Sequence, residues 1–158
     1  MDKNEMSSFG MGPINVIIIL IISGVFITVH YFTYPLFSIN IIPSIVFYAL
    51  AGFFILLGII IWLGAILAFL TVIRQKKLAT TCSYAFVRHP IYAGVLYIVI
   101  GGLLIFRSYI LLPLPFVFYF ITRYFTKIEE RYCIKKFGSE YEDYMKRVNA
   151  LIPTLFKK

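Results

Sequence analysis

Long apolar runs alternate with short polar clusters along this chain. The apolar runs span residues 14–32, 44–73, 91–106 and 109–125. A helix rises about 1.5 Å per residue, and the hydrocarbon core of a bilayer needs about 20 residues to cross it. The pattern therefore predicts an all-α fold: an integral membrane helical bundle with about four transmembrane helices, within one domain that covers residues 1–158.

The second apolar run is longer than one membrane crossing. As a single helix it would extend about 45 Å, so it would tilt, protrude or be interrupted. The sequence leaves open whether residues 44–73 form one helix or two. Gly52, Gly58 and Gly64 recur within the run and are predicted to be points of close helix packing.

Composition supports the bilayer as the solvent of this protein. Hydrophobic residues make up 61% of the chain and charged residues 14%, against about a quarter in soluble domains. The net charge of +8 is gathered at the ends of the apolar runs, which fits anionic headgroups better than nucleic acid. Residues 1–13 lack the basic segment and cleavage site of a signal peptide. Cys82 and Cys133 are interpreted as free thiols.

The distribution of cations predicts the orientation in the membrane. With four spans, the N-terminus, residues 74–90 and the C-terminal tail lie on one side, together with almost all Lys and Arg. Only Arg107 falls on the other side. By the positive-inside rule, both termini and the site described below face the cytoplasm.

Beyond the fourth run, residues 126–153 are predicted to form cytoplasmic helices. Gly138 is the expected stop of the first of them, and Ser139 with Glu142 has the spacing of a capping box for the second. Apolar residues then recur every three or four positions, which predicts an amphipathic helix lying on the membrane surface. They are Ile134, Phe137, Tyr141, Tyr144, Met145 and Val148.

Two polar clusters meet at one membrane depth if this topology holds. Arg88-His89-Pro90 opens the third span, and Glu129-Glu130 follows the end of the fourth. Because consecutive antiparallel spans are joined by a short turn, these clusters are expected to form one pocket. Arg123 lies two turns before the acidic pair, where ionisable groups usually face protein or water.

Each of these groups also has a purely structural interpretation. Arg88 can be a positive-inside anchor, and Arg123 can extend to the headgroups. Tyr92 can belong to an interfacial aromatic belt. The acidic pair can simply neutralise neighbouring cations on a solvated helix face.

The combined pattern resembles the isoprenylcysteine carboxyl methyltransferase and phospholipid methyltransferase superfamily. The shared signature is R-H-P-x-Y-x-G, here residues 88–94, followed after a hydrophobic stretch by E-E at 129–130. The ending F-G-S-E-Y-E-D-Y-M-K-R-V-N-A-L-I-P, residues 137–153, is also similar to that of the family. The resemblance covers about residues 76–153.

This resemblance implies S-adenosylmethionine as the cofactor, with no metal. It implies a cofactor site between the third and fourth spans, covered by the C-terminal helices. The implied cofactor-binding residues are Tyr84, His89, Tyr92, Gly94, Glu129 and Glu130. Arg88 and Arg123 are implied to bind the substrate, and Arg123 is the implied catalytic residue, because it matches an arginine that holds a substrate carboxylate in the isoprenylcysteine branch.

Three functional hypotheses follow. The first is an integral-membrane methyltransferase whose acceptor is an isoprenylcysteine-like carboxylate, a lipid amine, a thiol or a hydroxyl. The alternative is a non-enzymatic four-span scaffold with a basic lipid-binding tail. A transporter is disfavoured because the span centres hold almost no ionisable groups.

Overall fold

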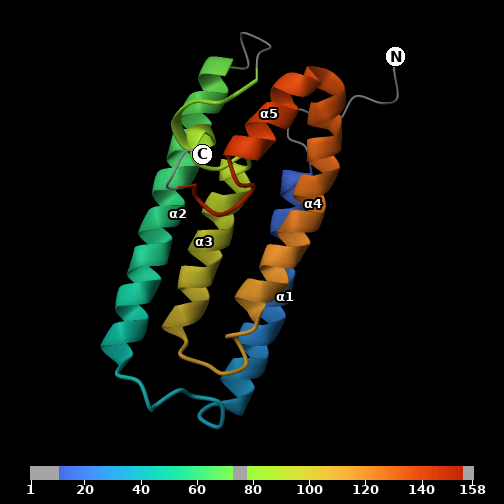
Figure 1. Cartoon of the computed structure of the whole chain (residues 1–158). Helices are drawn as coiled ribbons and strands as arrows, with labels where there is room; N and C mark the ends of the chain where they lie inside the picture. The colour runs from blue at the N-terminus through green and yellow to red at the C-terminus, as the bar shows by residue number, and fades with distance from the viewer. Residues whose placement is uncertain (1–10, 73–77, 155–158) are drawn as a thin grey trace.

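In the part of the chain that the structure describes, four long helices run side by side and a short fifth helix crosses one end of them (Figure 1). The computed structural model describes residues 11–72 and 78–154. The helices are α1 (Gly12–Thr33), α2 (Ser44–Val72), α3 (Pro90–Ile105), α4 (Leu114–Phe137) and α5 (Ser139–Arg147), with a 3₁₀ turn, η2 (Cys82–Ala85), before α3. Within these described ranges the only β-type pairings are isolated bridges. The predicted all-α bundle is confirmed.

The outer surface of the bundle is apolar. Helices α1 and α2 are long and apolar enough to cross a membrane, and α3 is a shorter apolar helix. Their outward-facing side chains include Ile21 at 62% exposure and Ile60 at 58%. A soluble protein rarely exposes continuous apolar surface of this kind, so a helical membrane bundle accounts for it.

The long second run is one continuous helix. Helix α2 contains 29 residues, which corresponds to about 44 Å. The question of one helix or two is thereby answered. The predicted end of this run at Ile73, and the basic cluster at 74–77, lie outside the described residues.

Glycines allow α2 and α3 to pack closely. A Cβ atom at Gly58 would come within 2.6 Å of the Gly94 carbonyl oxygen, and one at Gly101 within 2.7 Å of the Ala51 carbonyl oxygen. Gly64 faces the side chain of Ser83 in the same way. The packing role predicted for Gly58 and Gly64 is confirmed. The role predicted for Gly52 is wrong, because a Cβ there would meet nothing within 4 Å.

The fourth apolar run becomes a regular helix only near its prolines. Residues 109–113 are turns, and α4 begins at Leu114, with Pro113 as its N-cap residue. The amides of Leu111 and Leu112 both bond to the Ser108 carbonyl instead of continuing a regular helix. The helix then runs to Phe137 and stops at Gly138, whose φ of 59° lies in the left-handed region. That stop is confirmed.

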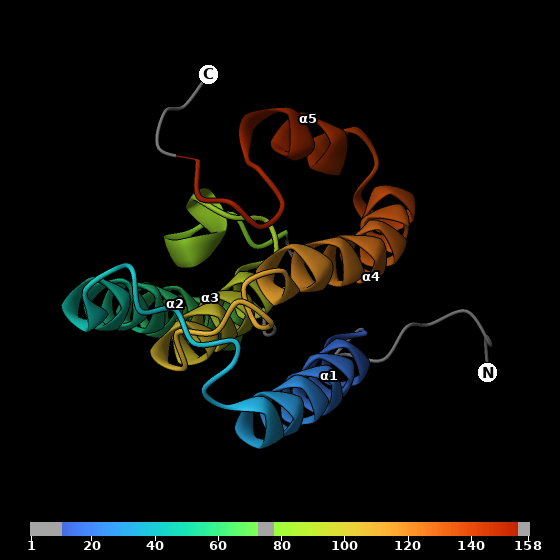
Figure 2. The ribbon, with the colours of Figure 1, turned by 90° about the horizontal axis from the view of Figure 1, so that it is seen from below.

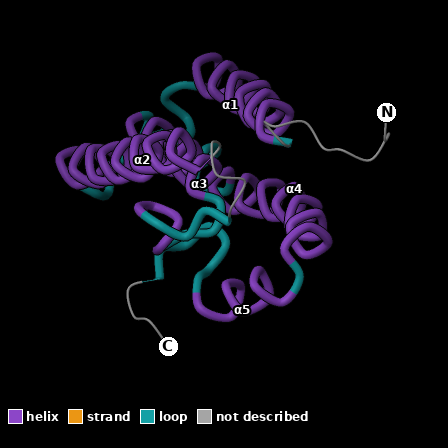
Figure 3. Tube along the Cα trace, turned by 90° about the horizontal axis from the view of Figure 1, so that it is seen from above, coloured by secondary structure: helices purple, strands orange, loops and turns teal. Residues whose placement is uncertain are grey.

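The helices alternate in direction, so residues distant in sequence share one end of the bundle. The start of α1, the start of α3, the end of α4 and all of α5 lie at the end that we call the site end (Figures 1 and 3). Seen from the opposite, far end, α2 lies beside α3 and α1 beside α4 (Figure 2). Ile19, Leu96 and Phe118 belong to the apolar core of the bundle.

Helix α5 corrects two predictions. Gly138 is its N-cap residue and no side chain caps it, so the capping box between Ser139 and Glu142 does not form. The amphipathic stripe exists, but it packs inside the protein. Tyr141 and Tyr144 are each 3% exposed, and they pack with Leu78 and Cys133 among others. The predicted placement of this stripe on the membrane surface is wrong, because the chain itself covers its apolar face.

Candidate functional site

The start of α3 holds Arg88 and His89 at the site end. Pro90 is the first residue of α3 and His89 its N-cap, an arrangement that proline favours because its fixed φ suits the first turn. The backbone before α3 is tied to the chain after α5. The Arg88 amide donates to the Asn149 carbonyl at 2.8 Å, and the His89 amide donates to the Ala150 carbonyl at 3.0 Å.

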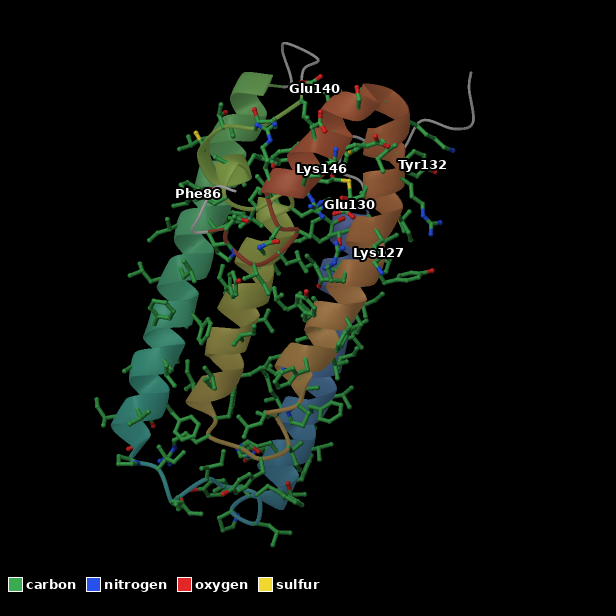
Figure 4. All side chains as sticks on the ribbon, viewed as in Figure 1. Phe86, Lys127, Glu130, Tyr132, Glu140 and Lys146 are labelled. Carbon is green, nitrogen blue, oxygen red and sulfur yellow. The ribbon has the colours of Figure 1, made fainter. Side chains whose placement is uncertain are left out.

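Glu130 reaches this pair from α4, as the sequence predicted. Its Oε1 atom accepts hydrogen bonds from Arg88 Nη2 at 2.7 Å and from Arg88 Nε at 3.2 Å. His89 Nε2 lies 3.3 Å from the same oxygen, and Arg123 Nη1 donates to it at 3.3 Å. Glu130 lies on the inner side of α4, whereas Tyr132 lies on the outer side (Figure 4). Groups 42 residues apart in sequence are thus hydrogen-bonded to each other.

Glu129 faces a second set of donors. Its Oε1 atom accepts a short hydrogen bond from the Tyr92 hydroxyl, and the Met11 amide donates to the same oxygen at 2.7 Å. His89 Nδ1 lies 3.6 Å from Glu129 Oε2. His89 therefore has a carboxylate at each ring nitrogen, and it can donate to both only when both nitrogens carry protons.

The cluster is buried and its charges are balanced by direct contact. The side chains of Arg88 and Glu130 are 7% and 6% exposed. Burial by itself would raise the pKa of Glu130, but hydrogen bonds from His89 and Arg88 and the charge of Arg88 lower it to about 2. Burial opposes a similar lowering of the Glu129 pKa by His89, Tyr92 and the Met11 amide. Both residues are therefore carboxylates at neutral pH.

Tyr84 lies beside this cluster on η2. Burial, together with the nearby charge of Glu129, raises the pKa of Tyr84 to about 12, so its phenol stays neutral. Its backbone carbonyl accepts a hydrogen bond from the Tyr144 hydroxyl at 2.5 Å, which joins η2 to α5. A neutral aromatic ring and a nearby carboxylate are both groups that favour an organic cation.

Two predicted residues have contacts beyond those foreseen. A Cβ atom at Gly94 would come within 2.7 Å of the Trp62 Cβ and 2.9 Å of the Gly58 carbonyl oxygen, so helix packing accounts for a glycine there. Its cofactor contact stays a prediction. Arg123 is 22% exposed and donates to Thr126 Oγ1 at 2.9 Å as well as to Glu130.

Sequence reasoning missed the contribution of α1. The Met11 amide reaches Glu129, and Asn15, one turn later, is 1% exposed and pairs with Thr122 of α4 at 3.3 Å. Pro13 lies in the first turn of this helix, and the first amides of any helix lack partners within it. Nothing in the sequence indicated which acidic residue would accept from them.

The structure also describes a hollow away from this cluster. A small hollow lies at the far end, away from the carboxylates, and is lined by residues that include Arg107, Ser108 and Leu111. No group of three or more His, Cys, Asp or Glu that could hold a metal ion occurs among residues 11–72 and 78–154.

Comparison with known families decides the relationship of the chain. The family model for phospholipid methyltransferase matches residues 39–140. The chain belongs to the phospholipid methyltransferase family. The match contains the R-H-P-x-Y-x-G signature and both glutamates, and it confirms the resemblance noted in the sequence. No curated protein and no solved structure matches the chain significantly.

Membership in the phospholipid methyltransferase family supports a membrane methyltransferase in general. The matched region ends at residue 140, so it includes α3 and α4 but only the beginning of α5. The contacts of α5 with Arg88 and Tyr84 are therefore known from the geometry of this chain alone.

Proposed function

We propose that this protein is an integral-membrane methyltransferase that moves a methyl group from S-adenosylmethionine to a lipophilic or small acceptor. The observation that carries the proposal is the junction of Arg88, His89 and Tyr92 with Glu129 and Glu130 at the site end. Buried charges are costly unless they are paired, so two adjacent buried carboxylates with three kinds of donor form a specialised site rather than a packing detail. Family membership supports the reaction class.

The residues at the junction fit the cofactor chemically. Bound S-adenosylmethionine would supply an electrophilic methyl group on a sulfonium cation, together with an ammonium group, a carboxylate and an adenine ring. Glu129 and Glu130 are assigned to the cationic groups, and His89 to a polar group of the cofactor. The rings of Tyr84 and Tyr92 are assigned to the sulfonium or to the adenine. Gly94 keeps its assignment as a cofactor-binding position.

The acceptor half of the site is assigned to Arg123. This side chain lies one turn closer to the membrane than Thr126 and about two turns closer than Glu130, and it is more exposed than Arg88. An acceptor with an anionic or polar head would meet its guanidinium while the apolar part stays in the bilayer. Alignment of the nucleophile, with charges placed beside it, supplies most of the rate in such a displacement. The acceptor is a carboxylate, an amine, a thiol or a hydroxyl.

The site end is assigned to the cytoplasm. The described part of the site end carries exposed Lys127, Arg131, Lys135 and Lys136 on α4, together with Lys146 and Arg147 on α5. The far end carries Arg107. A water-soluble cofactor would then enter from the cytosol, and the lipophilic acceptor from the membrane plane.

The same exposed cations favour one alternative, a scaffold that binds anionic lipid without catalysis. The two candidate functions make different demands on the carboxylates. A scaffold needs the outer cations of α4 and α5 and is indifferent to Glu129, which faces inward.

The test is methyl transfer from radiolabelled S-adenosylmethionine by the purified protein in lipid vesicles, with label counted separately in lipid and aqueous fractions. The native protein should transfer label into one of the two fractions. The variants Glu129→Gln and Glu130→Gln should each lose this transfer. Arg123→Gln should bind S-adenosylhomocysteine normally but transfer little label. Absence of transfer to any vesicle lipid, thiol or carboxylate acceptor, with vesicle binding retained, would support the scaffold instead.

A further inference from the structure

Arg88 joins two separate parts of the site end. Through Nε and Nη2 it contacts Glu130 at 3.2 and 2.7 Å. Through Nη1 it donates to the carbonyl oxygens of Met145 at 2.8 Å and Val148 at 2.6 Å. The guanidinium is planar, with five N–H donors in a fixed fork, and four of its hydrogen bonds go to these partners. The binding of a substrate, which the sequence assigned to this residue, would have to displace them.

The two carbonyl groups lie where a helix ends. Helix α5 stops at Arg147, with Val148 as its C-cap residue, and carbonyls in the last turn of a helix have no intrahelical partner. A cation at that end also interacts favourably with the helix dipole. Arg88 therefore caps α5 from outside, across 57 and 60 residues of sequence.

The chain after α5 reinforces this capping. Residues 149–154, which we call the C-terminal strap, run beside residues 86–89. Asn149 and Ala150 accept from the amides of Arg88 and His89, and the Thr154 amide donates to the Phe86 carbonyl at 2.8 Å. The Tyr97 hydroxyl donates to the Leu151 carbonyl at 3.2 Å. The strap and the end of α5 thus dock as one unit against the start of α3.

Glu130 reaches the end of α5 through Arg88. It reaches the strap through Arg88 and His89, whose amides donate to Asn149 and Ala150. Within the described part of the chain, the hydrogen bonds of its side chain go to Arg88, His89 and Arg123, which are all outside α5 and the strap. A change at Glu130 can reach the carbonyl groups of α5 directly by way of one guanidinium. Glu129 offers the matched contrast, because its partners are Tyr92, the Met11 amide and His89.

We propose that Arg88 is a positioning residue, and that its guanidinium couples the docking of α5 and the C-terminal strap to the orientation of Glu130. The consequence for catalysis rests on the proposed function. Glu130, which is assigned to the cofactor, is held in its binding orientation only when α5 is docked. The coupling itself is a property of the folded chain, and it can be measured without any cofactor.

The first experiment is hydrogen exchange, followed by mass spectrometry, on the full-length protein in detergent. Glu130→Gln should speed exchange in residues 145–154 by about tenfold or more, since the acceptor of the Arg88 hydrogen bonds loses its negative charge. Glu129→Gln should leave exchange in residues 145–154 unchanged. Equal acceleration by both variants, or by neither, would overturn the coupling.

Arg88→Met tests the route of the coupling. In that background, the further change Glu130→Gln should add nothing to exchange in residues 145–154, because the connection is already broken. Arg88→Lys should restore part of the protection, since an ammonium group is a point charge that cannot bridge both partners as the fork does. Arg131→Lys is the matched surface control. Additive effects of Arg88→Met and Glu130→Gln on this exchange would contradict the proposal. If the double variant does not fold, the exchange measured in Arg88→Lys decides the proposal.

A second arm measures the affinity for S-adenosylhomocysteine as a function of pH. Glu130 is faced by Arg88, His89 and Arg123, and more distantly by Tyr141 of α5 and Cys133 of α4. Arg88→Met should move the acid limb of binding to higher pH, because a carboxylate that loses a cation protonates more easily. A role in folding alone would instead lower the affinity equally at every pH, and would contradict the proposal.

The two arms separate the two claims. If the folded native protein does not bind S-adenosylhomocysteine at any pH, the proposed function fails, and the exchange data alone decide the coupling. If S-adenosylhomocysteine binds normally but Glu130→Gln does not change the exchange rate in residues 145–154, the coupling fails and the proposed function stands.

Discussion

The α2–α3 contact and the site end hold the same bundle together by opposite means. Between α2 and α3, glycines bring one helix backbone against the other, as where a Cβ at Gly94 would meet Trp62 and the Gly58 carbonyl. At the site end, α3, α4 and α5 are joined by charged groups that satisfy one another, with Arg88 and Glu130 at the centre. Apolar packing needs no particular partner group, whereas each charged group in the junction at the site end depends on a specific hydrogen-bonding partner.

This difference indicates which region can exchange partners. A contact made through glycines has no side chain that could turn to another partner. The α2–α3 pair is therefore suited to be a fixed frame. A carboxylate that accepts from a histidine, a tyrosine or an arginine can accept from a ligand cation in the same geometry. The comparison therefore makes the α2–α3 contact a fixed frame, and it makes the site end the region where a ligand can replace protein partners.

The largest expected effect comes from neutralising Glu130. Glu130→Gln leaves Arg88 buried without its counter-charge, so it should lower the free energy of unfolding by about 3–5 kcal/mol. Denaturant titration in mixed micelles measures this change. A loss below about 1 kcal/mol would mean that the charged junction contributes little and that the comparison is wrong.

The same carboxylate should give the protein an acid-sensitive component of stability. The pKa of Glu130 is about 2 in the folded protein, below its ordinary value of 4.5, so the folded state binds protons less readily. The stabilisation is present above about pH 4.5 and is lost as the pH falls toward about 2. Unfolding measured across this range should show the loss in the native protein, and a smaller loss in Glu130→Gln. Parallel curves for the two proteins would contradict the assignment.

Substitution in the α2–α3 contact should cost less than loss of the buried charge. Gly94→Ala places a methyl group against Trp62 and the Gly58 carbonyl, and overpacking of this kind costs about 1–3 kcal/mol. Gly102→Ala is the matched control, because nothing lies within 4 Å of its Cβ position. It should be neutral or stabilise the helix by up to about 1 kcal/mol. Thermal unfolding of both variants makes the comparison, and equal destabilisation would argue against close packing at Gly94.

The smallest expected effect concerns the docking of α5. Tyr144→Phe removes the hydrogen bond from the Tyr144 hydroxyl to the Tyr84 carbonyl, and should lower stability by about 1 kcal/mol. Hydrogen exchange should rise around η2 and α5 and stay unchanged along the α2–α3 contact. A rise of the same size in both regions would show that the two parts of the molecule are not independent.

Sequence periodicity predicted most of the fold because each long apolar run has only one way to satisfy its backbone in a bilayer. It also brought Arg88 and Glu130 together, since alternating helices return residues to the same end. It failed where tertiary contacts override local preference. The apolar stripe with Tyr141 and Tyr144 has the same sequence pattern whether lipid or protein covers it. In the folded protein, other residues of the chain cover it.

The candidate site shows the same limit. The topology predicted that His89 and Glu129 share one pocket, and the family resemblance implied their role in cofactor binding. The Met11 amide was not predicted, because a backbone donor leaves no trace in a sequence. The capping of α5 by Arg88 was missed for a related reason. It depends on carbonyl groups 57 and 60 residues away, and only the folded chain brings them within reach.

The central claim is that the charged junction at the site end binds S-adenosylmethionine. Calorimetric titration of the detergent-purified protein with S-adenosylhomocysteine tests it most directly, beside the His89→Ala variant. We predict saturable binding by the native protein and its loss in the variant, because His89 lies between both carboxylates. A folded native protein that takes up no ligand, or a variant that binds as well as the native protein, would contradict the claim.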